Sequence, residues 1–191
     1  MTKEQIAFGV SLVAMLFIAS SYFVKKKSQY LLMQALGICF LILSYLFTGE
    51  YFAMVGLIIG LARSATYLLY EIKNKTISVL WPSLFSLMGV IAYCIINLWI
   101  LQTAKLVDII YLIGLIAYAF VFWIRKLELL RYLVLIPTGI SILYNVLIHA
   151  VPFVIVSYSF ELTANLIAIA KYDLFQKKRI SPKQENQDEK N

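Results

Sequence analysis

Seven long apolar segments, separated by connections of only a few residues, constrain the fold of this chain more than any other feature. A helix that crosses the roughly 30 Å hydrocarbon layer of a membrane needs about 20 mostly apolar residues. Because the connections are so short, consecutive helices must be antiparallel neighbours. We therefore predict an all-α polytopic membrane protein. The predicted transmembrane helices cover about residues 5–24, 29–48, 51–71, 78–101, 106–124, 130–148 and 151–171.

The composition agrees with this fold class and excludes several others. Of the 191 residues 62% are hydrophobic and 14% are charged, and the mean hydropathy is +0.83, whereas an average soluble domain is about 45–50% apolar and about 25% charged. One histidine and two cysteines, Cys39 and Cys94, cannot supply a haem, a metal cluster or a disulfide framework. The sequence also has no glycine loop of the kind that holds phosphates. We therefore expect no enzyme activity and no cofactor.

Basic residues predict the orientation, because the cytoplasmic loops of membrane proteins are rich in lysine and arginine. Clusters of basic residues follow the first, third, fifth and seventh segments: Lys25, Lys26 and Lys27; Lys73 and Lys75; Arg125, Lys126 and Arg131; and Lys171, Lys177, Lys178 and Arg179. All four clusters face the cytoplasm if the N-terminus is outside and the C-terminus is inside. The net charge of +7 is then explained by membrane orientation, without a nucleic-acid partner. The polar residues 173–191 are expected to form a cytoplasmic tail.

The first three segments resemble the last three at an offset of about 100 to 102 residues. Residues 42–47 (ILSYLF) parallel residues 142–147 (ILYNVL), and both halves have the same order of basic, charge-poor and acidic–basic connections. Chance similarity between apolar helices is high, so the charge order is the stronger argument. In transporters, a parallel repeat of this kind places the substrate site between the halves, near the midplane of the membrane. The predicted 3+1+3 units are a first bundle over residues 1–75, a linker helix over residues 76–104 and a second bundle over residues 105–172.

Two ionisable residues, Arg63 and Glu161, lie near the middle of predicted transmembrane helices, where an unpaired charge costs several kcal/mol. They occupy equivalent helices of the two halves at similar depth, so an Arg–Glu pair across the centre would neutralise both. Such a pair would either line a polar pathway or only lock the bundles together. A third alternative is that Arg63 reaches toward the membrane surface on its own.

Other polar residues share helix faces with these two charges, because residues three or four apart lie on one side of a helix. Tyr158 and Asn165 flank Glu161 in this way, and Tyr67 follows Arg63. Several such faces favour a small hydrated cavity over hydrogen bonding between helices alone. Pro137, followed by Thr138 and Gly139, is expected to interrupt the sixth helix, as a hinge or as an ordinary membrane proline. The predicted substrate-binding residues are Arg63, Tyr67, Asn145, Tyr158, Glu161 and Asn165.

Two short motifs resemble the bacterial YgjV-type inner membrane protein family. The first is Gly60-Leu-Ala-Arg63-Ser64 in the third segment, where the family pattern is Asn-x-x-Arg-Thr, so Gly60 departs from it. The second is Ser159-Phe160, followed by Asn165 and by Lys171 at the end of the seventh segment. The resemblance extends over all seven segments. It implies a multi-pass protein of the bacterial cytoplasmic membrane.

The predicted 3+1+3 layout is also similar to the SWEET, PQ-loop and nicotinamide-riboside transporter families. The pocket of SWEET-like proteins contains asparagines in the third and seventh helices. Asn165 matches the second of these, and Arg63 or Ser64 lies where the first is found. The Pro-Gln signature of PQ-loop proteins is absent from the first and fifth segments. A likeness of fold alone does not establish function.

These observations lead to two functional hypotheses. The first is a uniporter-like facilitator of a small polar metabolite, in which one bundle rocks against the other around a midplane site. The second is a non-transporting scaffold that binds a cytosolic partner or anionic lipid through its basic face. The expected partners are the lipid bilayer and a small polar solute, and assembly into a homo-oligomer is left open.

Overall fold

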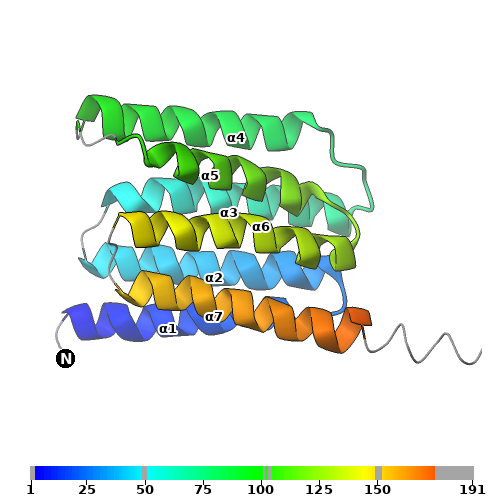
Figure 1. Ribbon diagram of the computed structural model, residues 1–191. Helices are drawn as coiled ribbons and strands as arrows, with labels where there is room; N and C mark the ends of the chain where they lie inside the picture. Colours follow the sequence, from blue (N-terminus) through cyan, green and yellow to red (C-terminus); the bar gives the residue numbers. More distant parts are fainter. Residues whose placement is uncertain (1–2, 49–50, 101, 103–104, 149–151, 175–191) are drawn as a thin grey trace, which may run out of the picture.

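A computed structural model describes residues 3–48, 51–100, 102, 105–148 and 152–174. Within these ranges the chain forms seven helices that lie side by side, as predicted (Figure 1). Both α4 and α7 continue into short π-helical segments, η1 and η2. The helices are α1 (Lys3–Ser21), α2 (Lys27–Thr48), α3 (Tyr51–Ile72), α4 (Leu80–Tyr93) with η1 (Cys94–Ile100), α5 (Asp108–Trp123), α6 (Leu127–Leu147) and α7 (Pro152–Ala168) with η2 (Ile169–Leu174).

The predicted helix boundaries differ from the observed ones mainly at charged ends. Helices α2 and α6 begin at Lys27 and Leu127, two to three residues before the predicted starts. Hydropathy excludes charged residues from a predicted span, although lysine, glutamate and arginine are good helix formers. The expected interruption at Pro137 is wrong, because α6 continues through this buried proline to Leu147. Proline removes one helical hydrogen bond, and the packing around α6 tolerates that loss.

The distribution of side chains is that of a membrane protein, with many large apolar groups on the outside and several polar groups buried among the apolar residues of the core. Leu80, Trp99 and Ile136 are among the many large apolar side chains that are exposed, whereas Gln34 and Thr138 are buried. Shorter apolar helices cover Gln5–Ser21 and Asp108–Trp123. Within the described part of the chain, four helical segments are long and apolar enough to cross a membrane: Lys27–Phe47, Met54–Ile72, Leu80–Ile100 and Leu127–Leu147. The protein is thus a helical membrane protein.

Six of the helices contact one another in a closed ring. Its order is α1, α2, α3, α5, α6 and α7, and α7 returns to contact α1. Helix α4 packs against α3 and α5 and lies at the edge of the molecule (Figure 1). The interior of this ring is where a polar site between the first and last helices of the chain can form.

The buried positions of α5 and α6 repeat those of α1 and α2 at an offset of 100 residues. With the exception of Asp108, every buried residue of α5 and α6 has a buried counterpart 100 positions earlier. Gly37 and Pro137 are one such pair: Gly37 packs against the Ala14 carbonyl of α1, and the Pro137 carbonyl packs against Gly114 of α5. The two helix pairs therefore share one pattern of packing. The counterparts are Ala14/Gly114, Ala19/Ala119, Ser21/Val121, Tyr22/Phe122, Tyr30/Leu130, Leu31/Arg131, Gln34/Val134, Gly37/Pro137 and Ile38/Thr138.

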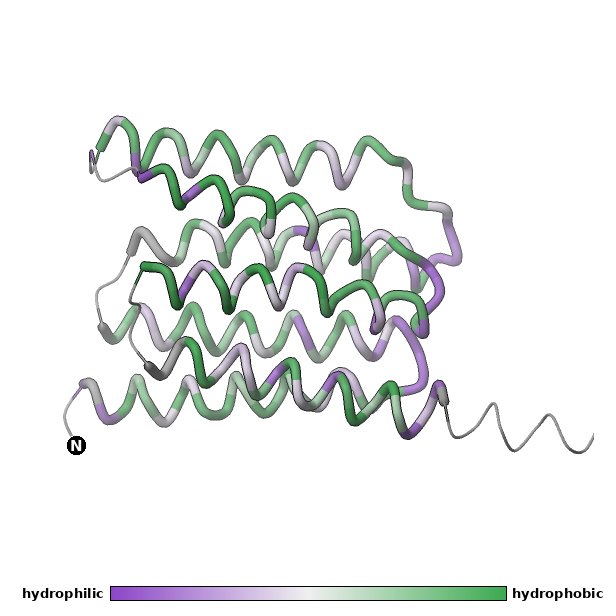
Figure 2. Tube along the Cα trace, in the orientation of Figure 1, coloured by the Kyte–Doolittle hydropathy of each residue, from purple (hydrophilic) through white to green (hydrophobic). Residues whose placement is uncertain are grey.

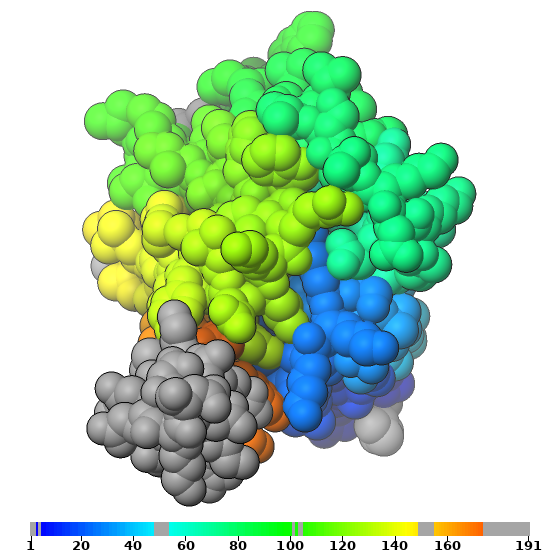
Figure 3. Space-filling model, turned by 90° about the vertical axis from the view of Figure 1, so that its right-hand side faces the viewer, coloured from blue at the N-terminus to red at the C-terminus, as the bar shows by residue number. Residues whose placement is uncertain are grey.

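One end of the molecule, which we call the basic end, holds the α1–α2 turn, the α3–α4 connection, the α5–α6 turn and the end of η2. Figure 2 shows the hydrophilic colouring gathered in these connections. Seen from this end, the residues of the α1–α2 turn and of the α5–α6 turn lie next to each other (Figure 3). The basic end thus brings the two halves of the chain into contact.

Candidate binding site

Arg63 and Glu161 both lie in the ring, but they do not form the expected ion pair. The Arg63 guanidinium carbon lies 4.6 Å from the centre of the Phe122 ring, and the Arg63 Nε is buried without a hydrogen-bond partner. Glu161 instead accepts a hydrogen bond of 2.5 Å from the Tyr22 hydroxyl. A cation over an aromatic face is stabilised by about 0.5–2 kcal/mol, which is weaker compensation than a carboxylate would give.

Aromatic side chains separate the two charges. Tyr30 is fully buried, and its ring lies 5.5 Å from that of Tyr22 and 5.7 Å from that of Phe122. Its hydroxyl lies close to the Tyr22 side chain but makes no hydrogen bond of standard geometry, and the residue lies within electrostatic range of both Arg63 and Glu161. We refer to Tyr22, Tyr30, Tyr118 and Phe122 as the aromatic cluster.

Tyr118 extends the aromatic cluster toward α6. Its ring lies 6.2 Å from that of Phe122, and its hydroxyl shares a hydrogen bond of 3.0 Å with the Thr138 hydroxyl. Tyr118 also lies within electrostatic range of Glu161 and Tyr158. Polar side chains from α2, α3, α5, α6 and α7, and Tyr22 just after α1, therefore lie near one another in the ring interior.

Of the six residues predicted to bind substrate, four lie in this region, one bonds two neighbouring helices together and one bonds within its own helix. Arg63, Glu161 and Tyr158 belong to it, since Tyr158 lies within electrostatic range of Glu161. Tyr67 lies within electrostatic range of Arg63, and its hydroxyl donates to the Ala119 carbonyl at 3.2 Å. The other two donate to backbone carbonyls of α6: Asn165 Nδ2 to Arg131 at 2.7 Å and Asn145 Nδ2 to Ser141 at 2.7 Å.

The aromatic cluster was missed by sequence reasoning. Tyr22 falls at the end of a predicted span, where tyrosine is usually an anchor in the membrane interface. Phe122 carries no polar atom and so gives no signal. The offset of 100 residues that pairs Tyr22 with Phe122 could have found both, because it marks them as one repeated interior position.

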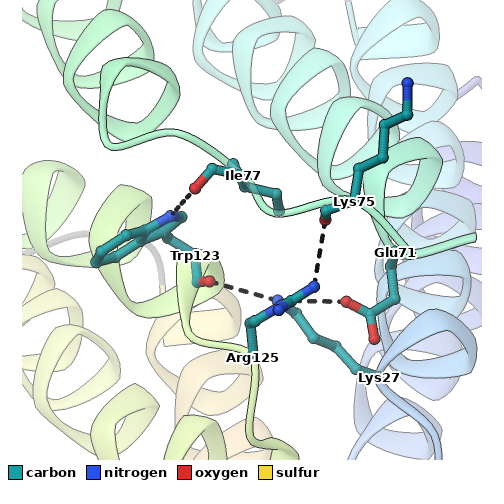
Figure 4. A network of polar contacts seen from close by, with 6 residues as sticks. All are labelled: Lys27, Glu71, Lys75, Ile77, Trp123 and Arg125. Carbon is teal, nitrogen blue, oxygen red and sulfur yellow. Dashed lines mark hydrogen bonds and ion pairs between the residues drawn. The ribbon is translucent and has the colours of Figure 1, made fainter. Parts of the chain in front are cut away.

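At the basic end, a first clasp joins Lys27, Glu71 and Trp123. The Lys27 ammonium lies 3.9 Å from a Glu71 carboxylate oxygen and donates to the Trp123 carbonyl at 3.5 Å (Figure 4). The Trp123 indole N–H donates to the Ile77 carbonyl at 2.9 Å, and Arg125 donates to the Lys75 carbonyl at 3.4 Å. The first clasp thus ties α2 and α3 to the end of α5.

A second clasp joins Arg131, Asp173 and Val24. Arg131 donates to Asp173 Oδ1 at 2.9 Å and to the Val24 carbonyl at 2.6 Å. Both side chains of this ion pair are almost fully buried. Burial raises the pKa of the Asp173 carboxyl above its ordinary value, and the Arg131 guanidinium partly offsets that rise.

The two clasps have the same construction. In each, a cation near the start of one helix (α2 or α6) pairs with an acid at the end of the helical segment that follows (α3 or η2). Each cation also binds a backbone carbonyl at the end of a helix from the opposite half of the chain, α5 or α1. The halves are thus held together reciprocally at the basic end.

At the other end of the ring, Asp108 organises a separate polar cluster. Its carboxylate accepts hydrogen bonds from the Tyr93 hydroxyl, from the Tyr144 hydroxyl at 3.0 Å and from the Lys105 backbone N–H at 2.7 Å. An acidic residue in the first turn of α5 also complements the helix dipole. These contacts join α4, α5 and α6.

Comparison with protein families identifies the class of protein to which this chain belongs. Residues 5–176 match the family model Imp-YgjV, described as bacterial inner membrane protein. The chain belongs to the Imp-YgjV family. Comparisons with curated proteins and with solved structures found no match. Membership in Imp-YgjV and the several apolar helices make this a multi-pass protein of the bacterial cell membrane.

The Imp-YgjV match confirms the resemblance noted in the sequence, and it includes both Arg63 and Glu161. The likeness to SWEET and PQ-loop proteins is not confirmed by the comparisons and stays a prediction. The family description gives a location, the bacterial inner membrane, and names no activity.

Proposed function

We propose that the protein is a facilitator-type transporter of a small polar metabolite. The observation that carries this proposal is the pair of unpaired, opposite charges in the ring interior, Arg63 and Glu161. A membrane protein gains no stability from isolated interior charges, and such residues usually mark a substrate or ion pathway. A purely structural pair would be expected to be in contact.

The proposed transport units are two three-helix bundles, α1–α3 and α5–α7, with α4 as the linker between them. The repeated burial pattern of α1–α2 and α5–α6 supports this division. The ring contacts between α3 and α5 and between α7 and α1 would then be the interfaces along which the bundles move. Parallel repeats in other transporters hold the substrate at this kind of interface.

The clasps fit the role of a gate at the basic end, which we place in the cytoplasm with the N-terminus outside. Both clasps use carbonyl groups of the opposite half, so they must break when the bundles separate at this end. A gate of this kind makes the conformation described here closed toward the cytoplasm. Alternating access follows if the other end opens while the clasps are intact.

The experiment is solute uptake into proteoliposomes with the purified full-length chain. Glu161→Gln is expected to abolish or strongly reduce uptake, because the interior carboxylate is lost while the shape of the side chain is kept. Glu128→Gln is the matched control, since Glu128 is exposed in the first turn of α6. Uptake that is equal in both variants and in the unmodified protein would refute the proposal.

A scaffold that binds anionic lipid is the second candidate, favoured by the exposed basic residues of the basic end. Six of them flank the clasps: Lys25, Lys26, Lys73, Lys75, Arg125 and Lys126. Near an anionic membrane surface each contributes about 1 kcal/mol of attraction. This function would survive Glu161→Gln and fail when these residues are neutralised together.

A further inference from the structure

We propose that the ligand of the interior site is a small carboxylate, bound by Arg63 with the Tyr30 hydroxyl. This inference rests on the proposed function, and it names the substrate class. The two interior charges differ in whether a proton can neutralise them. A carboxylic acid can lose its charge by binding a proton, whereas a guanidinium stays charged in proteins. Glu161 also has the Tyr22 hydroxyl as a partner, so Arg63 is the group that lacks compensation.

Among the described residues, the surroundings of Arg63 offer donors and aromatic faces but no acid in contact. The Phe122 ring covers the guanidinium, and the residues within electrostatic range of it are Tyr30, Tyr67 and Tyr118. The Arg63 Nε–H lacks a hydrogen-bond partner, and the fully buried Tyr30 hydroxyl, although close to the Tyr22 side chain, makes no hydrogen bond of standard geometry. Unpartnered buried polar groups are rare in native proteins and call for a specific explanation. An acceptor that binds between them would satisfy both.

The charge and shape of the site favour a carboxylate. A guanidinium presents a planar fork of donors that matches the two oxygens of a carboxylate or phosphate. A phosphate ester carries about 1.5–2 negative charges near neutral pH, and the ring interior around Arg63 offers one guanidinium among the described residues in contact or in range. A monoanion is therefore the ligand whose charge this site balances.

The carboxylate could belong to a simple organic acid or to an α-amino acid. Both ligands share the carboxylate that Arg63 recognises. Comparing alanine with lactate separates the two classes, because only alanine carries an ammonium group beside the carboxylate.

The test measures binding to the purified full-length protein in chloride-free buffer, by calorimetry. The probes are lactate, benzoate and alanine, with propane-1,2-diol as the neutral analogue of lactate, and inorganic phosphate and chloride as other anions. We expect at least one carboxylate to bind at least about tenfold more tightly than the diol, phosphate or chloride. Arg63→Gln should weaken that carboxylate at least about tenfold, and the exposed Arg125→Gln should not.

A second readout separates ligand binding from a structural role of Arg63. If the guanidinium serves a ligand, Arg63→Met removes an uncompensated charge, and the ligand-free melting temperature should stay the same or rise. A fall in melting temperature together with unchanged carboxylate binding would overturn the proposal. So would the failure of all the carboxylates to bind, or equally tight binding of the diol, phosphate or chloride.

The same probes separate this inference from the proposed transport function. Uptake of a neutral polar solute without carboxylate binding would refute the inference and leave transport supported. Carboxylate binding that Arg63→Gln abolishes, in a protein that moves no solute, would refute transport and support the inference.

Discussion

Replacing Arg131 by glutamine removes the cation of the second clasp and leaves the acid behind. The Arg131 and Asp173 side chains are 4% and 5% exposed, and the bond between them is 2.9 Å long. Breaking a buried ion pair by removing one partner costs about 3–5 kcal/mol, because the remaining charge is uncompensated. A typical domain has about 5–15 kcal/mol of stability, so we expect Arg131→Gln to remove a large share of it.

The first clasp supplies an internal comparison. There the Lys27 ammonium lies 3.9 Å from a Glu71 carboxylate whose side chain is 29% exposed. The Lys27 side chain itself is 2% exposed, but water can solvate the carboxylate that Lys27→Gln leaves behind. The loss should therefore lie near the value of about 0–1 kcal/mol for an exposed ion pair. Arg131→Gln should therefore lower the free energy of unfolding by at least about 2 kcal/mol more than Lys27→Gln does.

The assay is equilibrium unfolding in mixed detergent micelles, followed by circular dichroism. Arg125→Gln, at an exposed site, serves as the control and should change the free energy by no more than about 0.5 kcal/mol. The double variant Arg131→Gln, Asp173→Asn should recover part of the loss, since no charge is then left buried without a partner. Equal losses of unfolding free energy for Arg131→Gln and Lys27→Gln would refute the reasoning. A double variant that loses more unfolding free energy than the two single variants together would also refute it.

Three further predictions test packing and hydrogen bonding. A Cβ at Gly37 would lie 2.5 Å from a side-chain carbon and 3.1 Å from a backbone oxygen of α1, so Gly37→Ala should lower stability by about 1–3 kcal/mol. Gly9→Ala should not, because a Cβ at Gly9 has nothing within 4 Å, and thermal melts of the two variants compare them. Tyr22→Phe deprives Glu161 of its hydroxyl partner and should cost about 1–3 kcal/mol in the same unfolding assay. Trp123→Phe removes a 2.9 Å hydrogen bond and should cost about 0.5–1.5 kcal/mol in denaturant unfolding, and an unchanged midpoint would contradict the prediction.

The number of helices and their approximate bounds could be predicted, because a membrane fixes the length of an apolar helix. The position of Arg63 relative to Glu161 could not. Sequence gives the depth of a residue along a helix, and the ring decides which helices are neighbours. Helix α3 packs against α2, α4 and α5, whereas α7 packs against α6 and α1, so two residues of similar depth lie across the ring from each other.

The second clasp shows a different limit. The sequence groups Arg131 with the basic residues of a cytoplasmic connection and places Asp173 in the polar tail. Both are buried, since α6 begins at Leu127 and the helical segment after α7 continues to Leu174. A charged residue close to a membrane surface can be solvated by water or paired with an opposite charge. Its hydropathy value is the same in both cases. Only the partner, 42 positions away in the chain, decides between them.

The crossed construction of the clasps also bears on the order in which the protein folds during synthesis. The helices α1 to α3 are made first, and at that stage the Val24 carbonyl has no Arg131 and the Lys27 ammonium has no Trp123 carbonyl. Neither contact can form until α5 and α6 are in place beside them. The nascent first half must therefore stay in the membrane with the α1–α2 turn lacking these contacts. Both clasps are completed only when the later helices have inserted beside it.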